Sequence, residues 1–65
     1  MKLIVNGDAL DLAASDLARA LEILDYGDAV VATALNGAFV PARARATTAL
    51  NDGDRIEIVA PRQGG

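Results

Sequence analysis

The sequence predicts an α+β domain in which a mixed sheet of four to five strands carries one main helix on one face. Two Asn-Gly pairs, at 6–7 and 36–37, each lie between short runs of residues that favour strands. One helical pattern covers 15–27, and a last strand pattern covers 55–60. Because one helix cannot cover two faces of a sheet, we place it on one face of a single sheet.

The first hairpin is predicted over residues 3–12. The Asn-Gly pair at 6–7 tolerates the positive φ angles that a type I′ turn requires. In the second arm, Leu10 and Leu12 share one side of the strand and alternate with polar or small residues. This alternation is typical of a strand with one buried face.

The helix is predicted over residues 15–27. Ser15 or Asp16 can cap its first turn, and Gly27 suits the C′ position just past its end. Its apolar residues recur at spacings i, i+3, i+4 and i+7, which gives one apolar stripe. This stripe consists of Leu17, Ala20, Leu21 and Leu24.

The second half of the chain predicts a third strand over 30–35 and a short strand over 38–40, followed by an irregular segment over 42–50. In the final strand, Ile56 and Ile58 are expected to face the core. The helix is long enough as a connection to allow parallel pairing through a right-handed crossover. The first and last strands are therefore expected side by side in the centre, which is the ubiquitin-like β-grasp arrangement.

Composition excludes several classes of function. The 65 residues include no cysteine and no histidine, so there is no thiol nucleophile, no zinc-thiolate site and no imidazole base. The net charge of −3 argues against nucleic acid as a partner, because phosphate binding needs clustered Lys and Arg. No apolar stretch approaches the length of a membrane span. We expect a cytoplasmic protein, monomeric when free, with no bound metal or cofactor and no catalytic activity of its own.

The last five residues look unlike the rest of the domain. We expect residues 1–60 to form the folded body and residues 61–65 to form a flexible tail that ends in Gly64 and Gly65. Two glycines without side chains suit a narrow channel in a partner and leave the final carboxylate unhindered. Activation of that carboxylate with ATP would let a sulfur nucleophile produce a thiocarboxylate, or an amine produce an amide. A partner would supply the active site.

The chain also resembles a known family, the bacterial sulfur carriers of thiamine thiazole synthesis known as ThiS. The resemblance covers almost the whole sequence and rests on an ordered set of short motifs. These are MKLIVNG at 1–7, ALNGAFVP at 34–41, LNDGDRIEIV at 50–59 and QGG at 63–65.

The resemblance implies a specific chemistry for the end of the chain. An ATP-dependent activating enzyme of the ThiF type would adenylate the carboxyl group of Gly65, and ATP would be consumed by that partner. Sulfur that originates from a cysteine desulfurase would convert the adenylate to a thiocarboxylate, which a thiazole synthase of the ThiG type would use. Gly64 and Gln63 would thread into the partner site. From the residues alone, Val59 should point away from Ile56 and Ile58 and be partly exposed. It is interpreted either as an ordinary exposed apolar residue or, with Arg62, as the flank of a docking surface for the activating enzyme.

Other functions stay open from the residues alone. The small subunit of molybdopterin synthase shares the Gly-Gly end, although the stretch at 60–63 lacks the apolar residue that usually precedes it. A ubiquitin-like modifier would form an amide through the same carboxylate, and a plain interaction module would have an inert tail. Arg43 and Arg45 are interpreted either as solvated loop residues or as contacts for an acidic patch on a partner. Asn36 is interpreted as a turn former only.

Overall fold

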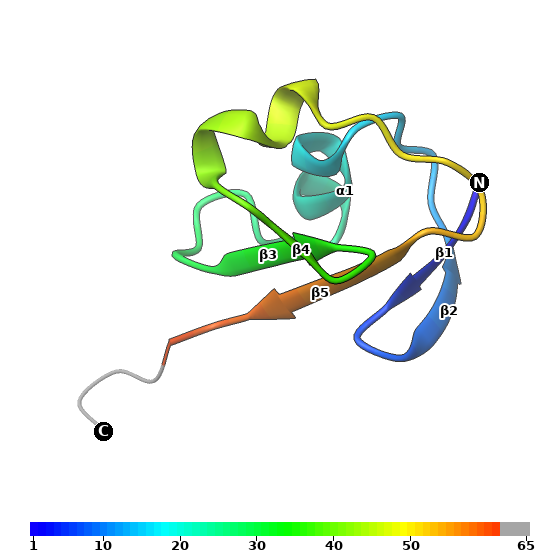
Figure 1. Ribbon diagram of the computed structural model, residues 1–65, viewed down its shortest axis with the longest axis horizontal. Helices are drawn as coiled ribbons and strands as arrows, with labels where there is room; N and C mark the ends of the chain where they lie inside the picture. The colour runs from blue at the N-terminus through cyan, green and yellow to red at the C-terminus, as the bar shows by residue number, and fades with distance from the viewer. Residues whose placement is uncertain (62–65) are drawn as a thin grey trace.

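Five strands form one mixed sheet in the order β2-β1-β5-β3-β4 in this computed structural model, which describes residues 1–61 (Figure 1). The central pair, β1 and β5, is parallel, and the other three neighbouring pairs are antiparallel. The strands are β1 (Lys2–Val5), β2 (Asp8–Asp11), β3 (Ala32–Leu35), β4 (Ala38–Val40) and β5 (Arg55–Val59). The predicted β-grasp arrangement, with the first and last strands side by side, is confirmed.

The helix α1 (Leu17–Ile23) lies across one face of this sheet (Figure 1). Strand side chains alternate between this covered face and the opposite one, as β5 shows most clearly. There Ile56 and Ile58 are buried, whereas Arg55, Glu57 and Val59 are exposed. The core beneath the helix is aliphatic. It consists of Leu3, Val5, Leu12, Ala14, Leu17, Ala20, Leu21, Val31, Val40, Leu50, Ile56 and Ile58.

Both Asn-Gly turns have the backbone geometry that the sequence predicts. Asn6 and Gly7 have φ angles of 49° and 88°, and Asn36 and Gly37 have φ angles of 51° and 86°. Positive φ at both central residues is what a type I′ turn needs, and its twist suits a two-residue hairpin. The two turns therefore set the pairing of β1 with β2 and of β3 with β4.

The N-terminal cap of α1 is confirmed, but the position predicted for its C-terminal glycine is wrong. The Asp16 carboxylate accepts from the backbone N–H of Arg19 over 2.8 Å. At the other end, Asp25 rather than Gly27 takes the left-handed conformation, with a φ of 72°. The N–H of Tyr26 then donates to the carbonyl of Leu21 over 2.7 Å, which closes a Schellman motif. The Tyr26 side chain, just beyond this earlier end, packs against the core.

The segment predicted to be irregular contains a 3₁₀ helix, η1 (Ala42–Thr47), and this corrects the prediction for residues 42–50. Pro41 precedes it with an extended backbone, and the hydroxyl of Thr48 donates to the carbonyl of Ala44 over 2.6 Å. Such local bonds sustain a short 3₁₀ helix despite its poorer geometry. The η1 segment packs beside α1, and Leu50 beyond it enters the core.

Candidate functional site

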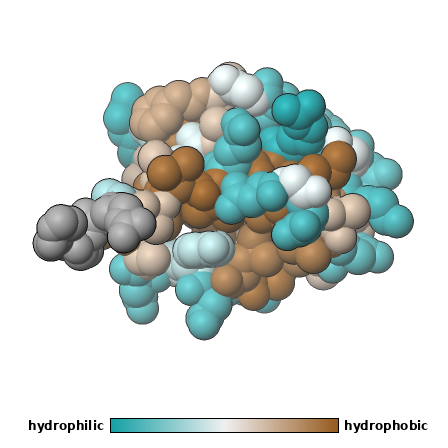
Figure 2. Space-filling view, turned by 90° about the horizontal axis from the view of Figure 1, so that it is seen from below, coloured by the Kyte–Doolittle hydropathy of each residue, from teal (hydrophilic) through white to brown (hydrophobic). Residues whose placement is uncertain are grey.

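The face of the sheet opposite α1 has no helix over it within residues 1–61, and Figure 2 shows apolar side chains gathered on it. We call this surface the open face. Two of its apolar side chains are strongly exposed, with 70% of Phe39 and 64% of Val59 accessible to solvent. The open face is formed by Ile4, Ala32, Ala34, Phe39, Arg55, Glu57 and Val59.

Strand register fixes the arrangement of the open face. Ala34 of β3 lies opposite Phe39 of β4 on one side and opposite Glu57 of β5 on the other. Ala32 lies opposite Val59 in the same way. Since alanine is small, a shallow hollow lies between the larger side chains of these strands. The hollow has apolar walls and one carboxylate, that of Glu57.

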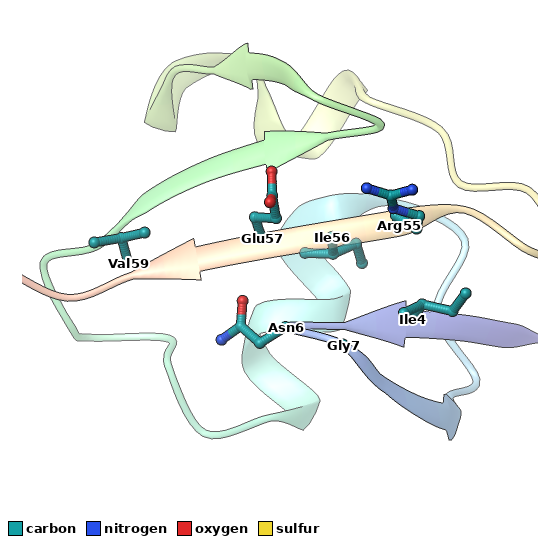
Figure 3. A pocket seen from close by; sticks show the side chains of 7 residues that line it. All are labelled: Ile4, Asn6, Gly7, Arg55, Ile56, Glu57 and Val59. Carbon is teal, nitrogen blue, oxygen red and sulfur yellow. The ribbon is translucent and has the colours of Figure 1, made fainter.

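A second, larger groove of about 610 Å³ lies where β1 and its turn meet β5 (Figure 3). Glu57 and Val59 line both depressions, so the outer side of β5 is the ridge between them. The groove is lined by Ile4, Asn6, Gly7, Arg55, Ile56, Glu57 and Val59. The last residues of β5 therefore offer both apolar surface and polar groups to a partner.

The charges of the open face are not neutralised by ion pairs within residues 1–61. The two ion pairs of this part of the chain lie elsewhere, between the Met1 ammonium and Asp11 and between Arg19 and Glu22. The hydrogen bond from the Met1 ammonium, and then its charge, lower the pKa of Asp11. Groups of acidic side chains able to hold a metal ion are absent from the described residues.

Arg45 has a different role from either interpretation of it. Its guanidinium lies over the start of β3, where Nη2 donates to the carbonyl of Val31 over 2.6 Å and Nε donates to the hydroxyl of Thr33 over 3.0 Å. Arg43 is exposed, as expected for a solvated loop residue. Only the second arginine is thus part of the internal structure.

The side chains of the two turn asparagines have a role that the sequence did not reveal. Asn6 bonds to the backbone of Ile58, and the Asn36 carboxamide oxygen accepts from the N–H of Arg55 over 2.9 Å. Asn36 also donates to the Asp54 carboxylate over 3.0 Å. Each asparagine therefore ties its hairpin to β5. The only signal for this role in the sequence is that asparagine side chains readily bond to nearby backbone.

Of the site residues predicted from the sequence, Val59 is the one that the structure describes. It lies at the end of β5, exposed as expected and on the open face. Arg62, Gln63, Gly64 and Gly65 lie outside the described residues. Within residues 1–61, no helix is long and apolar enough to cross a membrane.

These features define a class, the small ubiquitin-like β-grasp domain with an uncovered sheet face. Comparison with known proteins identifies the family within this class. The family model described as ThiS family matches residues 3–65, so the chain belongs to the ThiS family. Among solved structures, the chain is similar to a protein described as thiamine biosynthesis protein (ThiS) from Geobacter metallireducens. The two share 29% sequence identity with a TM-score of 0.84, over 100% of each chain. No curated protein matches the sequence.

Membership of this family supports a sulfur carrier role, and it agrees with the resemblance seen in the sequence motifs. The family also implies contacts with an activating enzyme and with sulfur-donating partners in general. The open face is the surface of the described residues that fits such contacts, because it joins exposed apolar side chains to the strand that leads to the Gly-Gly sequence.

Proposed function

We propose that this chain carries sulfur for thiazole formation in thiamine biosynthesis, with Gly65 as the sulfur-bearing residue. The observation that carries the proposal is the match to the ThiS family over residues 3–65, which includes the Gly-Gly end. A solved protein described as a thiamine biosynthesis protein matches the chain over its full length, which supports the same assignment.

The proposed chemistry takes place on the carboxylate of Gly65. An activating enzyme of the ThiF type joins this carboxylate to the AMP part of ATP and releases pyrophosphate. A sulfide equivalent that originates from a cysteine desulfurase then attacks the acyl carbon, and AMP leaves. The product is a thiocarboxylate, whose sulfur passes to a thiazole synthase of the ThiG type. ATP is a substrate of the activating enzyme, so this chain needs no cofactor of its own.

We divide the work between a body, residues 1–60, and a tail, residues 61–65. Gly64 and Gln63 thread into the partner's active site, where the absence of a side chain on Gly64 permits close approach. The body is the part that the partner enzymes recognise and bind. Between these binding events the chain is a monomer in the cytoplasm. Catalytic groups come from the partners, since the chain has neither cysteine nor histidine to offer.

The open face is the proposed docking surface, with Val59 at the end of β5 and Arg62 three residues further along the sequence. Phe39 and Val59 present large apolar areas, and exposed patches of this kind mark sites of protein interaction. Glu57 lies between the two depressions and offers a carboxylate to a cation on the partner. A mixed surface of this sort suits a partner that binds and then leaves.

Intact mass spectrometry tests the proposal directly. The purified chain is incubated with a ThiF-type enzyme, ATP and sulfide, and we expect a mass gain equal to replacement of one oxygen by sulfur, located at Gly65. The matched control is the chain without Gly65, which should keep its fold and gain no sulfur. An unchanged mass, while an established carrier is loaded in parallel, would overturn the proposal. Formation of higher-mass conjugates with lysine-containing proteins would instead indicate a ubiquitin-like modifier.

A further inference from the structure

The side chain of Asn6 makes a paired contact with the end of β5. Its carboxamide oxygen accepts from the N–H of Ile58 over 2.8 Å, and its carboxamide nitrogen donates to the carbonyl of Ile58 over 3.2 Å. One side chain thus satisfies both backbone polar groups of one strand residue. A carboxamide presents the same donor and acceptor as a peptide group, so Asn6 imitates a neighbouring strand.

The side-chain bonds of Asn6 replace backbone pairing here because β1 is shorter than β5 at this end. The parallel pairing of the two strands ends with Val5 opposite Ile56, and the backbone N–H of Asn6 makes one last bond to the carbonyl of Ile56 over 2.9 Å. After that the chain turns into β2, so no residue of β1 remains to pair with Ile58. The Asn6 carboxamide extends the ladder by one further step, at the edge of the groove on the open face.

Asn36 offers a natural comparison at the other end of the same strand. It has the same place in a type I′ turn, with a φ of 51° against 49° for Asn6. Its oxygen accepts from the N–H of Arg55, the first residue of β5. The side chains of the two asparagines therefore bond to the backbone of β5 at its opposite ends. Only Asn6 acts at the end from which residues 62–65 continue.

We propose that Asn6 is a positioning residue for the sulfur-bearing end of the chain. This inference rests on the proposed function. By bonding both polar groups of Ile58, Asn6 holds the last part of β5 against β1, so that the chain leaves the sheet at one fixed point. The acyl group must meet ATP in a narrow geometry, and small misplacements of a reacting group reduce rates strongly. Loss of the bonds should therefore slow the chemical step more than it weakens docking.

The test compares Asn6→Gly with Asn36→Gly. Glycine accepts positive φ without strain, so each variant keeps its turn and loses its side-chain bonds to β5. Asn36→Gly also loses the bond from Asn36 to the Asp54 carboxylate, just before β5. We measure adenylation kinetics with a ThiF-type enzyme, at a temperature well below the thermal unfolding midpoint of both variants. For Asn6→Gly we expect kcat to fall about tenfold with KM changed less than about twofold. For Asn36→Gly we expect both constants to stay within about twofold of wild type, because its bonds lie at the far end of β5.

Amide hydrogen exchange supplies a readout that the kinetics do not. In Asn6→Gly the amide of Ile58 should exchange about tenfold faster, whereas in Asn36→Gly it should exchange as in wild type. Asn6→Asp serves as a second variant, because it keeps the turn and the acceptor for the Ile58 N–H but loses the donor. Because a carboxylate oxygen would then face the Ile58 carbonyl oxygen, which the carboxamide nitrogen contacts over 3.2 Å, its kcat should fall at least as far as that of Asn6→Gly.

The outcomes distinguish a failure of the proposed function from a failure of the role proposed for Asn6. If wild type gains no sulfur in the mass assay, the proposed function itself fails. If wild type is loaded normally, but the two glycine variants show equal losses of kcat, the role of Asn6 is only structural and the inference is overturned. Faster exchange at Ile58 with an unchanged kcat would overturn it as well, because the end of β5 would then not need to be held.

Discussion

Arg45 of η1 donates from Nε to the hydroxyl oxygen of Thr33 in β3, over 3.0 Å. The hydroxyl in turn donates to the carbonyl of Val40 over 2.8 Å, so Thr33 is both acceptor and donor. Only 1% of Thr33 is exposed, which makes it the one buried polar residue of the described core. The chain of bonds joins η1 to β3 and β4, at the edge of the sheet far from β2. A buried hydroxyl is tolerated here because both of its bonding capacities are used.

Replacing Arg45 with alanine should lower the free energy of unfolding by about 1–2 kcal/mol. The change removes two hydrogen bonds from a charged donor, one of them to the carbonyl of Val31, and bonds to charged groups contribute more than neutral ones. Urea unfolding followed by circular dichroism measures the loss. Arg43→Ala is the matched control, since Arg43 is exposed, and its effect should stay within about 0.5 kcal/mol. Equal losses in the two variants would contradict the role assigned to Arg45.

Replacing Ile58 with alanine should cost about 2–5 kcal/mol of stability, because its buried side chain would leave a cavity beneath α1. Val59→Ala, one residue further along, should change stability by less than about 0.5 kcal/mol, since Val59 is on the open face. Chemical denaturation of both variants checks the pair. A loss below about 1 kcal/mol for Ile58→Ala would be incompatible with the observed packing.

Polar substitutions on the open face should weaken binding to the activating enzyme without unfolding the chain. In the double variant Phe39→Ser and Val59→Ser, we expect the Kd to rise at least about tenfold, because a few large side chains supply most of the binding energy of a protein interface. Isothermal titration calorimetry gives the Kd. The control is Ile23→Ser, which removes a 40% exposed apolar side chain from α1, on the other side of the sheet. If Ile23→Ser weakens binding as much as the double variant, the docking surface includes the helix and the assignment to the open face is wrong.

The ion pair between the Met1 ammonium and Asp11 should make stability depend on pH in the acid range. The hydrogen bond from the ammonium, then its charge and that of Lys2, lower the pKa of Asp11 below its ordinary value of 3.8. The folded pKa is the lower one, so the stabilisation is complete above about pH 3.8 and is lost as the pH falls through the folded pKa. NMR titration of the Asp11 carboxyl carbon measures the shift.

Acetylation of the N-terminus removes the ammonium and is the control for this titration. In the acetylated chain the pKa of Asp11 should move back towards 3.8, and the acid-dependent part of stability should shrink. A folded pKa at or above 3.8 in the unmodified chain would show that the pair does not form in solution.

The strands were predictable from the sequence because their signals are local. Each Asn-Gly pair specifies a type I′ turn by itself, and the alternation around Ile56 and Ile58 identifies the buried side of β5. The turns and the buried side of β5 need no knowledge of contacts between distant residues, which is why they were predicted correctly. The parallel pairing of β1 and β5 was inferred differently, from a helix that serves as a crossover connection between the first hairpin and the later strands.

The features that sequence reasoning missed depend on contacts between distant segments. The helix ends at Ile23, and Tyr26 beyond it packs on the core, a contact that no local rule predicts. Arg45 resembles any loop arginine until η1 carries it over Thr33. The bond between Asn6 and Ile58 joins residues 52 positions apart, so spacing along the chain gives no hint of it.

The candidate site was predicted in part. The exposure of Val59 followed from strand alternation, and its position on the open face was found as expected. The partners of Val59 on that face, Phe39 and Ala34, could not be assigned because the register of β3 with β4 and β5 is a property of the whole sheet. The roles of Gly64 and Gly65 stay predictions, and the loading experiment decides them.

The place of β5 in the sheet has a consequence for how the protein is made. A ribosome completes both hairpins and the helix before it adds Arg55, yet β1 and β3 meet only through β5. Until that strand emerges, the nascent chain holds two separate hairpins, which are marginally stable at best in water. A fragment that ends before this point lacks Ile56 and Ile58 of the core and the strand that joins the two hairpins. We therefore expect such a fragment to be cut by proteases much faster than the full chain.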